Sequence, residues 1–395
     1  MSELSIRPKV LVFIPNYLPG YESGGILRTV VNTVDWLSDD YEFWIVTRDR
    51  DLGSDAQYPD INLNEWQNVE GAMVRYLPPH LCTTSYLAKL IAETPHALIH
   101  LNSFFDPVFT IKILLARRIG WVMRKPLVLS VRGELVEGCL RLKYLKKVSY
   151  ITLSKFMGFY KNVVWHASSK YEALDFIKVL SLKDDHIKVA LDLPSKVVPR
   201  APNSALLGDN CLRVVFLSRL TREKNLDYAL RILQRVKAKM VFDIYGPAED
   251  PAYLNECHEL INNLPKNILV KYYGPVSPSR VSEIFSSYDL FFFPSRGENY
   301  GHVIAESISV GTKILISNNT PWRDLESEGL GWDLDLKEEI AFVDILEKLS
   351  LEGFDQRLEK RALIQSRAHK RLLNPEVLND NRDLFRISKA DSSTT

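Results

Sequence analysis

The chain has 395 residues, a length typical of two large domains rather than one compact core. Hydrophobic residues make up 46% and charged residues 25%, fractions typical of a soluble globular protein that exclude a disordered or fibrous chain. Fifty lysines and arginines against 49 acidic residues leave a net charge of +1, so no global field attracts nucleic acid or a membrane.

The cysteines and the N-terminus predict a cytoplasmic protein. Cys82, Cys139, Cys211 and Cys257 are far apart and form no C-x-x-C pair, which argues against a disulfide framework or a zinc site. We expect buried thiols in a reducing compartment. The first apolar run, residues 10–15, is shorter than the ~20 residues of a membrane span, and residues 1–9 do not form a signal peptide.

Short β-rich apolar runs alternate with amphipathic segments along the first half, which predicts parallel sheets covered by helices, an α/β fold. Leu27, Val30, Val34 and Leu37 fall at helical spacing and predict a crossover helix after the first strand. Residues 191–210 contain three prolines and one glycine and predict a linker. The predicted strands are residues 10–15, 43–47, 73–77, 97–101, 127–131 and 163–166.

The second half repeats the pattern and then becomes helical from about Lys337, with a polar, frayed end at residues 389–395. We expect one doubly wound domain over 1–198, another over 199–372, and a C-terminal helix and tail over 373–395 that can pack back on the first. Such sheets bind ligands at the carboxyl ends of their strands, which predicts a site in a cleft between the domains. The predicted strands here are residues 212–218, 240–246, 268–273, 290–294 and 313–317.

The strongest chemical signal is residues 291–317, which read FFFPSRGENYGHVIAESISVGTKILIS. Glu298 lies in the loop after a strand, and Glu306 lies in the second turn of a helix that we expect to start near Gly301. Each carboxylate can accept two hydrogen bonds from a vicinal diol such as a ribose or a sugar ring. The backbone amides of Tyr300, Gly301 and His302 suit a phosphate. The alternative is a solvated Glu298 and a helix-surface Glu306.

This segment resembles the E-x7-E region of family 4 glycosyltransferases, which are retaining enzymes with a two-domain GT-B fold and nucleotide-sugar donors. The resemblance implies that Glu306 holds the ribose and that Glu298 contacts the donor sugar. It also implies that loop amides from Asn299 to His302 serve the diphosphate and the sugar. Residues 1–198 would then be the Rossmann-like acceptor-side domain, and 199–372 the Rossmann-like nucleotide-sugar-binding domain.

A second motif, FLSRLTREKN at residues 216–225, places two cations after the first strand of the second domain. Arg219 and Lys224 can neutralise a diphosphate leaving group, and the resemblance implies this role. The alternative is a solvated, charge-rich loop. Gly246 and Val276 lie where the family cradles the base of its donor.

The first domain offers a glycine loop and two polar residues after its fourth strand. Gly24 and Gly25 precede a helix and let the backbone approach an anionic group, as the family's glycine loop does with donor phosphates. His100 and Asn102 follow in LIHLNS. Many relatives carry histidine at the position of Asn102, and we expect His100 to be a hydrogen-bonded packing residue.

The stretch SVRGELVEG contains Arg132 and resembles the R-G element of a subgroup active in bacterial surface-polysaccharide assembly. The resemblance implies that Arg132 contacts the acceptor or the donor phosphates. The alternative is an ion pair of Arg132 with Glu134 or Glu137. Trp322 is predicted to be a packing residue.

Residues 138–165 carry six lysines and arginines and no acidic residue, with aromatic residues between them. Such a basic, aromatic helical face suits anionic headgroups or a lipid-diphosphate acceptor, and hence peripheral contact with the inner face of a membrane. The alternative is an ordinary amphipathic crossover helix with a solvated face.

Together these motifs predict a retaining glycosyltransferase, of the hexosyltransferase type, that moves a sugar from a nucleoside diphosphate sugar to a hydroxyl. The expected acceptor is a glycan or a lipid-linked saccharide in polysaccharide biosynthesis. We expect no cofactor and no divalent metal, because no D-x-D lies near the proposed diphosphate site. The alternatives are a non-catalytic nucleotide-sugar or glycan-binding protein and a sugar-nucleotide epimerase on the same fold. A nicotinamide dehydrogenase is disfavoured because no G-x-G-x-x-G follows the first strand.

Overall fold

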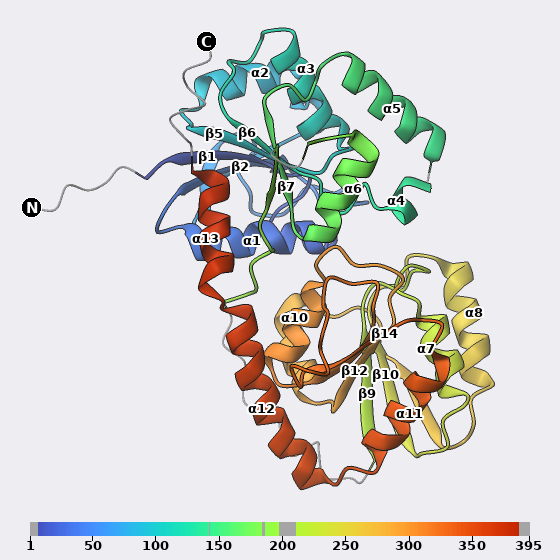
Figure 1. The fold of residues 1–395 in the computed structure, drawn as a ribbon. Coiled ribbons are helices and arrows are strands. Elements are labelled where there is room, and N and C mark those ends of the chain that lie inside the picture. Colours follow the sequence, from blue (N-terminus) through green and yellow to red (C-terminus); the bar gives the residue numbers. More distant parts are fainter. Residues whose placement is uncertain (1–6, 142, 184–185, 197–210, 387–395) are drawn as a thin grey trace, which may run out of the picture. The chain divides into compact units, whose positions relative to one another are not determined.

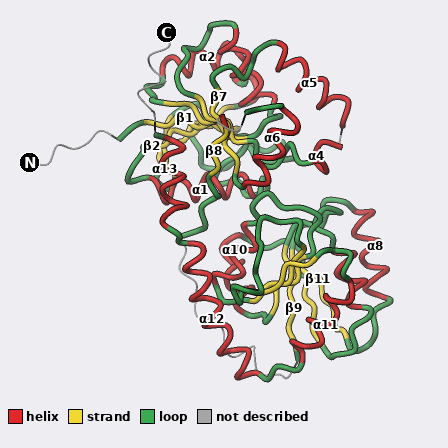
Figure 2. The backbone as a smooth tube through the Cα atoms, in the orientation of Figure 1, coloured by secondary structure: helices red, strands yellow, loops and turns green. Residues whose placement is uncertain are grey.

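The computed structural model describes residues 7–141, 143–183, 186–196 and 211–386 (Figure 1). Contacts divide the chain into two units: unit 1 is Met1–Lys196 with Pro375–Thr395, and unit 2 is Val197–Asn374. Each unit has its own sheet of mainly parallel strands with flanking helices (Figure 2), so the predicted α/β class with two doubly wound domains is confirmed. Residues 197–210 of the predicted linker and the predicted tail lie outside the described residues.

The described strands of unit 1 form one sheet in the order β3-β4-β2-β1-β5-β6-β7-β8. All neighbours are parallel except β3 and β4, which pair antiparallel at one edge. The strands are β1 (Lys9–Phe13), β2 (Glu42–Arg48), β3 (Trp66–Val69), β4 (Ala72–Leu77), β5 (Leu98–Asn102), β6 (Leu127–Ser130), β7 (Val163–Ala167) and β8 (Ile187–Val189).

Residues alternate between the two faces of this sheet, and each face has its own apolar cluster. On β1, Leu11 and Phe13 belong to one cluster, whereas Val10 and Val12 belong to the other, which also includes Phe385. The helical elements are α1 (Gly25–Leu37), η1 (Pro79–Leu81), α2 (Thr84–Glu93), η2 (Pro107–Ile111), α3 (Lys112–Arg118), α4 (Glu137–Arg141), α5 (Tyr144–Phe156), α6 (Lys170–Leu180) and the C-terminal α13 (Pro375–Phe385).

Unit 2 has a parallel sheet in the order β11-β10-β9-β12-β13-β14, which is the order of a dinucleotide-binding Rossmann sheet. The strands are β9 (Leu212–Leu217), β10 (Met240–Tyr245), β11 (Ile268–Tyr272), β12 (Leu290–Phe293), β13 (Lys313–Ser317) and β14 (Gly331–Leu334). The helical elements are α7 (Leu226–Leu233), α8 (Pro251–Asn262), η5 (Pro278–Arg280), α9 (Val281–Ser286), α10 (His302–Ser309), α11 (Glu339–Ser350) and α12 (Phe354–Leu372).

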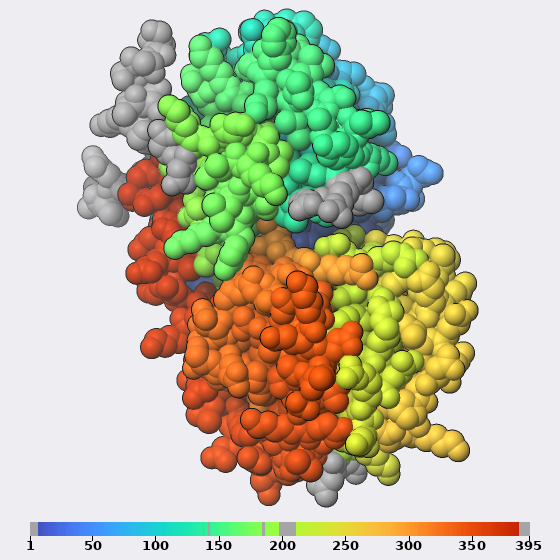
Figure 3. Space-filling model, turned by 45° about the vertical axis from the view of Figure 1, so that its right-hand side comes forward, coloured from blue at the N-terminus to red at the C-terminus, as the bar shows by residue number. Residues whose placement is uncertain are grey.

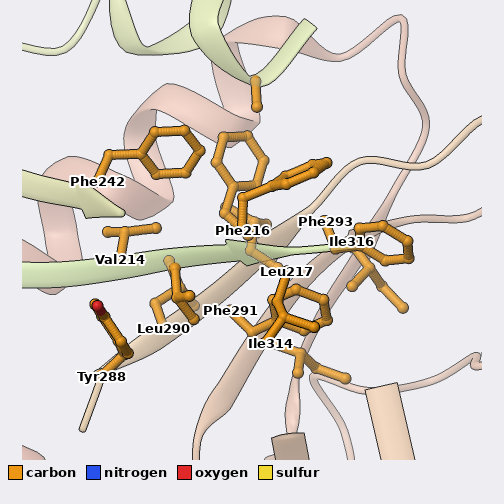
Figure 4. Packing of buried hydrophobic residues seen from close by; sticks show 14 of the residues in the cluster. Val214, Phe216, Leu217, Phe242, Tyr288, Leu290, Phe291, Phe293, Ile314 and Ile316 are labelled. Carbon is orange, nitrogen blue, oxygen red and sulfur yellow. The ribbon is translucent and has the colours of Figure 1, made fainter. Parts of the chain in front are cut away.

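The core of unit 2 is rich in phenylalanine (Figure 4). Phe291 and Phe293 on β12 stack with ring centroids 5.1 Å apart, and Phe216 on β9 packs edge-on against Phe293 at 5.8 Å. These rings are fully buried, so the adjacent strands β9 and β12 form a rigid base for the loops that leave their carboxyl ends.

Every strand predicted from the sequence is present within one or two residues, and three further strands were missed. They are β3, β8 and β14, which are only three or four residues long and partly exposed, with a polar residue inside each. The expectation that all cysteines are buried was wrong, because Cys139 is exposed and Cys211 is half-buried. No helix among the described residues is long and apolar enough to span a bilayer.

A buried polar chain crosses three neighbouring strands of unit 1. The Ser130 hydroxyl lies 2.8 Å from Nε2 of His100 and 2.6 Å from Nδ1 of His166, whose Nε2 lies 2.9 Å from the carbonyl oxygen of Ala190. Burial, with the nearby Arg132 charge, lowers the pKa of His166 to about 4 and holds the pKa of His100 well below its usual range.

Because both folded-state pKa values are lowered, the unfolded chain binds protons below about pH 6.5 that the folded chain excludes. The contribution of these histidines to the free energy of unfolding should therefore be fully present above that pH and decrease as the pH falls toward 4. We expect urea unfolding to report a loss on the order of 2 kcal/mol from His166 between pH 7.5 and 5.0. His166→Asn should reduce this pH dependence, whatever its effect on stability at pH 7.5. An unchanged pH slope in that variant would contradict the assignment.

Gly246, after β10, has a φ of 134° and lies against the backbone that follows β9. A Cβ atom at this position would be 1.7 Å from the Ser218 carbonyl oxygen. Gly246→Ala should therefore destabilise unit 2 on the order of 3 kcal/mol by urea unfolding. Gly353→Ala is the matched control, because an added methyl there meets no atom within 4 Å. Equal unfolding midpoints for the two variants would exclude this account.

Candidate active site

The predicted site residues of unit 2 lie around the point where the strand order reverses. Strands β9 and β12 are hydrogen-bonded neighbours, and their following helices depart in opposite directions along the sheet order. Open α/β sheets bind ligands in the crevice outside the carboxyl ends of strands at this position. The loop after β9 carries Arg219 and Lys224, and the loop after β12 carries Glu298.

Lys224 and Glu298 meet directly across these two loops. The Lys224 ammonium lies 2.5 Å from Oε1 of Glu298, and the same oxygen accepts a 2.9 Å hydrogen bond from the Ser295 hydroxyl. The two side chains are 18% and 10% exposed, so the pair is largely withdrawn from bulk water but open on one side. A cation and a carboxylate are thus held together at the ligand-binding edge of the sheet.

Two hydrogen bonds to backbone carbonyl oxygens join the two loops independently of this ion pair. The amide of Arg296 donates to the Glu223 carbonyl oxygen at 2.8 Å, and the Asn225 side chain donates to the Pro294 carbonyl oxygen at 2.9 Å. Asn225 has a left-handed φ of 64° and starts α7. Burial raises the pKa of Glu223, and the nearby Lys224 charge offsets part of this increase. The loop conformations are therefore fixed by more than one interaction.

The loop 299–301 leads into α10, which begins at His302 as predicted. Gly301 has a φ of 82°, and no side chain caps the helix. The Tyr300 carbonyl oxygen accepts a 2.5 Å hydrogen bond from the Trp322 indole, whose ring packs against Tyr300. Glu306 is half-buried in the second turn. Asn299 and His302 are also half-buried.

Arg219 has a different partner from Lys224. Its guanidinium forms a 3.0 Å ion pair with Glu249, and its side chain is 46% exposed. Surface pairs of this kind contribute little stability, so Arg219 can exchange Glu249 for an anionic ligand at small cost. The Gly246 amide donates to the Gly274 carbonyl oxygen at 2.8 Å, and Val276 is half-buried against the core of unit 2. These residues form the adjoining part of the same edge.

In unit 1 the structure links the predicted glycine loop to Arg132. Gly24 has a φ of 62° and open space around it, and Gly25 is the first residue of α1. Thr29, one turn into α1, donates from its hydroxyl to Asp192 at 2.8 Å. Asp192 in turn forms a 2.8 Å ion pair with Arg132. The helix start and the arginine are therefore part of one network.

Arg132 forms its ion pair with Asp192, a partner that was not predicted from the sequence. The sequence had suggested Glu134 or Glu137 as alternative partners of Arg132. Glu134 instead accepts hydrogen bonds from the Ser103 hydroxyl and from the amides of Phe104 and Phe105. Arg132 also donates to the side-chain oxygen of Asn102 at 2.8 Å. Its side chain is 4% exposed and its φ is 61°, so the guanidinium is held in a buried network.

His100 and Asn102, the two polar residues of β5, are both buried. His100 is buried and bonded to Ser130, as expected of a packing histidine. Asn102 is fully buried, and besides Arg132 its amide reaches the Phe13 carbonyl oxygen at 3.4 Å. Within the described ranges no group of three or more histidine, cysteine or acidic side chains could hold a metal ion.

Sequence reasoning missed several residues that hold the site in shape. Ser295 lies inside segment 291–317 and Asn225 inside segment 216–225, and the asparagine directly after Lys224 was a recognisable signal for a left-handed helix start. Trp322 is buried, as predicted for a packing residue. Asp192 lies 60 residues from Arg132 in a stretch interpreted as linker. No local signal could have identified it.

Comparisons with known proteins identify similar sequences and similar folds. Residues 200–371 match the family described as "Glycosyl transferases group 1". "Uncharacterized glycosyltransferase MJ1607" of Methanocaldococcus jannaschii is 22% identical over 283 residues, covering 65% of this chain and 70% of that protein. "Alpha-monoglucosyldiacylglycerol synthase" of Streptococcus pneumoniae is 30% identical over 117 residues, 28% of this chain and 25% of that protein.

Among solved structures, HepE of Anabaena in complex with UDP and glucose superposes with a TM-score of 0.70. It is 15% identical in sequence, and the match covers 96% of this chain and 98% of HepE. At this identity the likeness concerns the fold, which is GT-B. With residues 200–371 matching the group 1 glycosyl transferases and a GT-B fold, the chain is a glycosyltransferase.

Proposed function

We propose that the chain is a retaining family 4 enzyme that transfers a sugar from a nucleoside diphosphate sugar to a hydroxyl acceptor. The observation that carries the proposal is the Lys224 and Glu298 pair at the point where the strand order of unit 2 reverses, one loop before α10 and Glu306. HepE, which shares the fold, has been solved with UDP and glucose, and this supports a UDP-sugar as the first donor to test.

Each group in this region has a role that its chemistry suits. Glu306 would accept hydrogen bonds from the ribose diol, and Glu298 from hydroxyls of the donor sugar. Lys224 and Arg219 would neutralise the diphosphate, together with the amides of residues 299–302 at the start of α10. Gly246 and Val276 would line the base.

The leaving diphosphate would also assist the reaction. In same-face substitution its departing oxygen takes the proton of the incoming hydroxyl, so no side chain needs to act as a nucleophile. Lys224 would stabilise the charge that develops on that oxygen, since fixed charges placed before the reaction need no reorganisation. In unit 1, Gly24 and Gly25 would contact the donor phosphates. Arg132 would act on the acceptor side through the Asp192 network, or reach a phosphate after leaving Asp192.

The acceptor that we propose is a glycan or a lipid-linked saccharide in polysaccharide biosynthesis, made at the inner face of a membrane. The supporting likeness is the partial match to alpha-monoglucosyldiacylglycerol synthase, whose name describes a lipid product. The basic segment 138–165 adds a surface suited to anionic headgroups.

The direct test is turnover of UDP-, GDP- and ADP-sugars with hydroxyl acceptors, preceded by a thermal-shift screen of the donors. A donor at 100 times its dissociation constant stabilises the protein by ~2.7 kcal/mol. We expect acceptor-dependent release of the nucleoside diphosphate and a product with the anomeric configuration of the donor by NMR. Donor binding without turnover would favour the binding protein, and rearranged sugar without acceptor would favour the epimerase.

Glu306→Ala should lower kcat/KM for the donor on the order of 10 to 150-fold, because it removes one partner of a charge-assisted hydrogen bond of ~1.5 to 3 kcal/mol. Glu259→Ala on α8 is a matched control, since this glutamate is exposed and belongs to neither of the loops described. Unchanged kinetics in a folded Glu306→Ala protein would remove the ribose assignment.

Catalysis should not require a divalent metal, because Arg219 and Lys224 supply fixed positive charge. We expect enzyme treated with EDTA to keep most of its rate, and Lys224→Ala to lose on the order of 100-fold in kcat. Lys224→Arg should recover part of this loss if charge matters, whereas a merely structural role would show as a lowered melting temperature. Activity that EDTA abolishes and magnesium or manganese restores, with Lys224→Ala unaffected, would show that a metal carries this charge.

A further inference from the structure

The loop between α3 and β6 exposes large apolar side chains beside cations. Trp121 is 56% exposed and Met123 is 79% exposed, and both lie in the run RIGWVMRK that starts at Arg118. The cations Arg118 and Arg124 are exposed as well. Exposing large apolar side chains such as tryptophan and methionine to water is unfavourable, which indicates that a membrane or a protein partner covers them.

The outer face of α5 has the same character. Leu145, Leu153 and Phe156 are 81%, 58% and 89% exposed, and they fall within a narrow sector of the helix because they are spaced by eight and three residues. Lys146 and Lys155 are exposed on either side of this sector. The helix buries Ile151 and Ser154 on its inner side, so its apolar outer stripe is not part of the core.

These two segments are neighbours in the fold. Arg118 donates from Nε to the Met157 carbonyl oxygen at 2.6 Å, and Arg117 reaches the Asn162 carbonyl oxygen at 3.3 Å. The end of α3 therefore lies beside the end of α5. Figure 1 shows α5 at the outside of unit 1, and green atoms of this region form part of the surface in Figure 3.

Charge indicates what covers this surface. The sequence has no aspartate or glutamate between Asp106 and Glu134, or between Glu137 and Glu172. Among the described residues, none of the exposed cations Arg124, Lys146 and Lys155 lies within ion-pair distance of a carboxylate. A second copy that paired through this same surface would place like charges against each other, which is unfavourable, whereas an anionic lipid surface is complementary.

We propose that this membrane-docking surface, formed by Trp121, Met123, Leu153 and Phe156 with Arg124, Lys146 and Lys155, binds anionic phospholipid bilayers. The apolar side chains enter the boundary between headgroups and acyl chains, where tryptophan is favoured, and the cations contact lipid phosphates. The surface differs from the one expected from residues 138–165 alone, because the α3 to β6 loop contributes its apolar tip. It does not depend on sugar transfer.

The test is co-sedimentation of the full chain with vesicles of phosphatidylglycerol and phosphatidylcholine, and with vesicles of phosphatidylcholine alone. We expect binding to the first and little to the second. The triple variant Arg124→Gln, Lys146→Gln, Lys155→Gln should bind on the order of 100-fold more weakly, at about fivefold per cation. The control triple Lys239→Gln, Lys266→Gln, Lys337→Gln removes the same charge from exposed positions of unit 2 and should bind as the wild type does.

The apolar part has its own readout. Vesicles with brominated acyl chains should quench wild-type tryptophan fluorescence, and Trp121→Phe should lose most of that quenching while it still sediments. Trp121→Ser with Phe156→Ser should weaken binding, unlike Ile340→Ser with Leu351→Ser, two exposed apolar residues of unit 2. Circular dichroism checks that each variant is folded.

Three outcomes would overturn the proposal. They are equal binding to both kinds of vesicle, equal losses in the surface and control variants, and a dimer in size-exclusion chromatography that the Trp121 and Phe156 changes abolish. The last would assign the surface to a second copy of the chain. Vesicle binding requires no donor or acceptor. A negative vesicle result therefore does not contradict the proposed sugar transfer, and a negative transfer assay does not contradict vesicle binding.

Discussion

The ion pair between Lys224 and Glu298 is the interaction on which the arrangement of the unit 2 site depends. It joins loops from strands that lie next to each other in the sheet but more than 70 residues apart in the chain. Both side chains are largely buried, so each charge is stabilised mainly by the other and not by water. The pair lies at the edge of the sheet where a ligand would bind. A ligand that brings a diphosphate toward Lys224 and hydroxyls toward Glu298 would meet two groups that already have the required charges, and their supporting bonds from Ser295 and Asn225 keep the two loops in place.

Unit 1 supports its loops with a different kind of contact. Arg132 and Asp192 form a buried pair that connects the loop after β6 with the segment after β8 and, through Thr29, with α1. Removing one member of such a pair leaves an uncompensated buried charge, which is far more costly than losing a surface pair. The left-handed backbone of Arg132 is tolerated because this network fixes the guanidinium.

The sequence was sufficient to predict the parallel architecture, because strands buried on both faces are continuous apolar runs, as in residues 290–293. It also identified both loops at the strand-order reversal, since Glu298, Glu306 and Lys224 stand in recognisable motifs. Strands such as β14, with two apolar residues of four, depend on a neighbour for their conformation and gave no local signal. The partner of Arg132 was unpredictable for the same reason, because tertiary contacts at large sequence separation have no periodicity to detect.

Helix α13 belongs to unit 1 although all of unit 2 precedes it in the chain. Phe385 packs against Tyr41, Phe43 and His100, and Asn381 donates to the Leu191 carbonyl oxygen at 2.8 Å. During synthesis, at ~5 to 20 residues per second, the first sheet would wait for about 10 to 40 seconds with this apolar face uncovered while residues 197–374 are made. Helix α13 leaves the ribosome after all of unit 2 and thus completes unit 1, so a chain cut short before Pro375 would expose the aromatic residues that α13 normally covers.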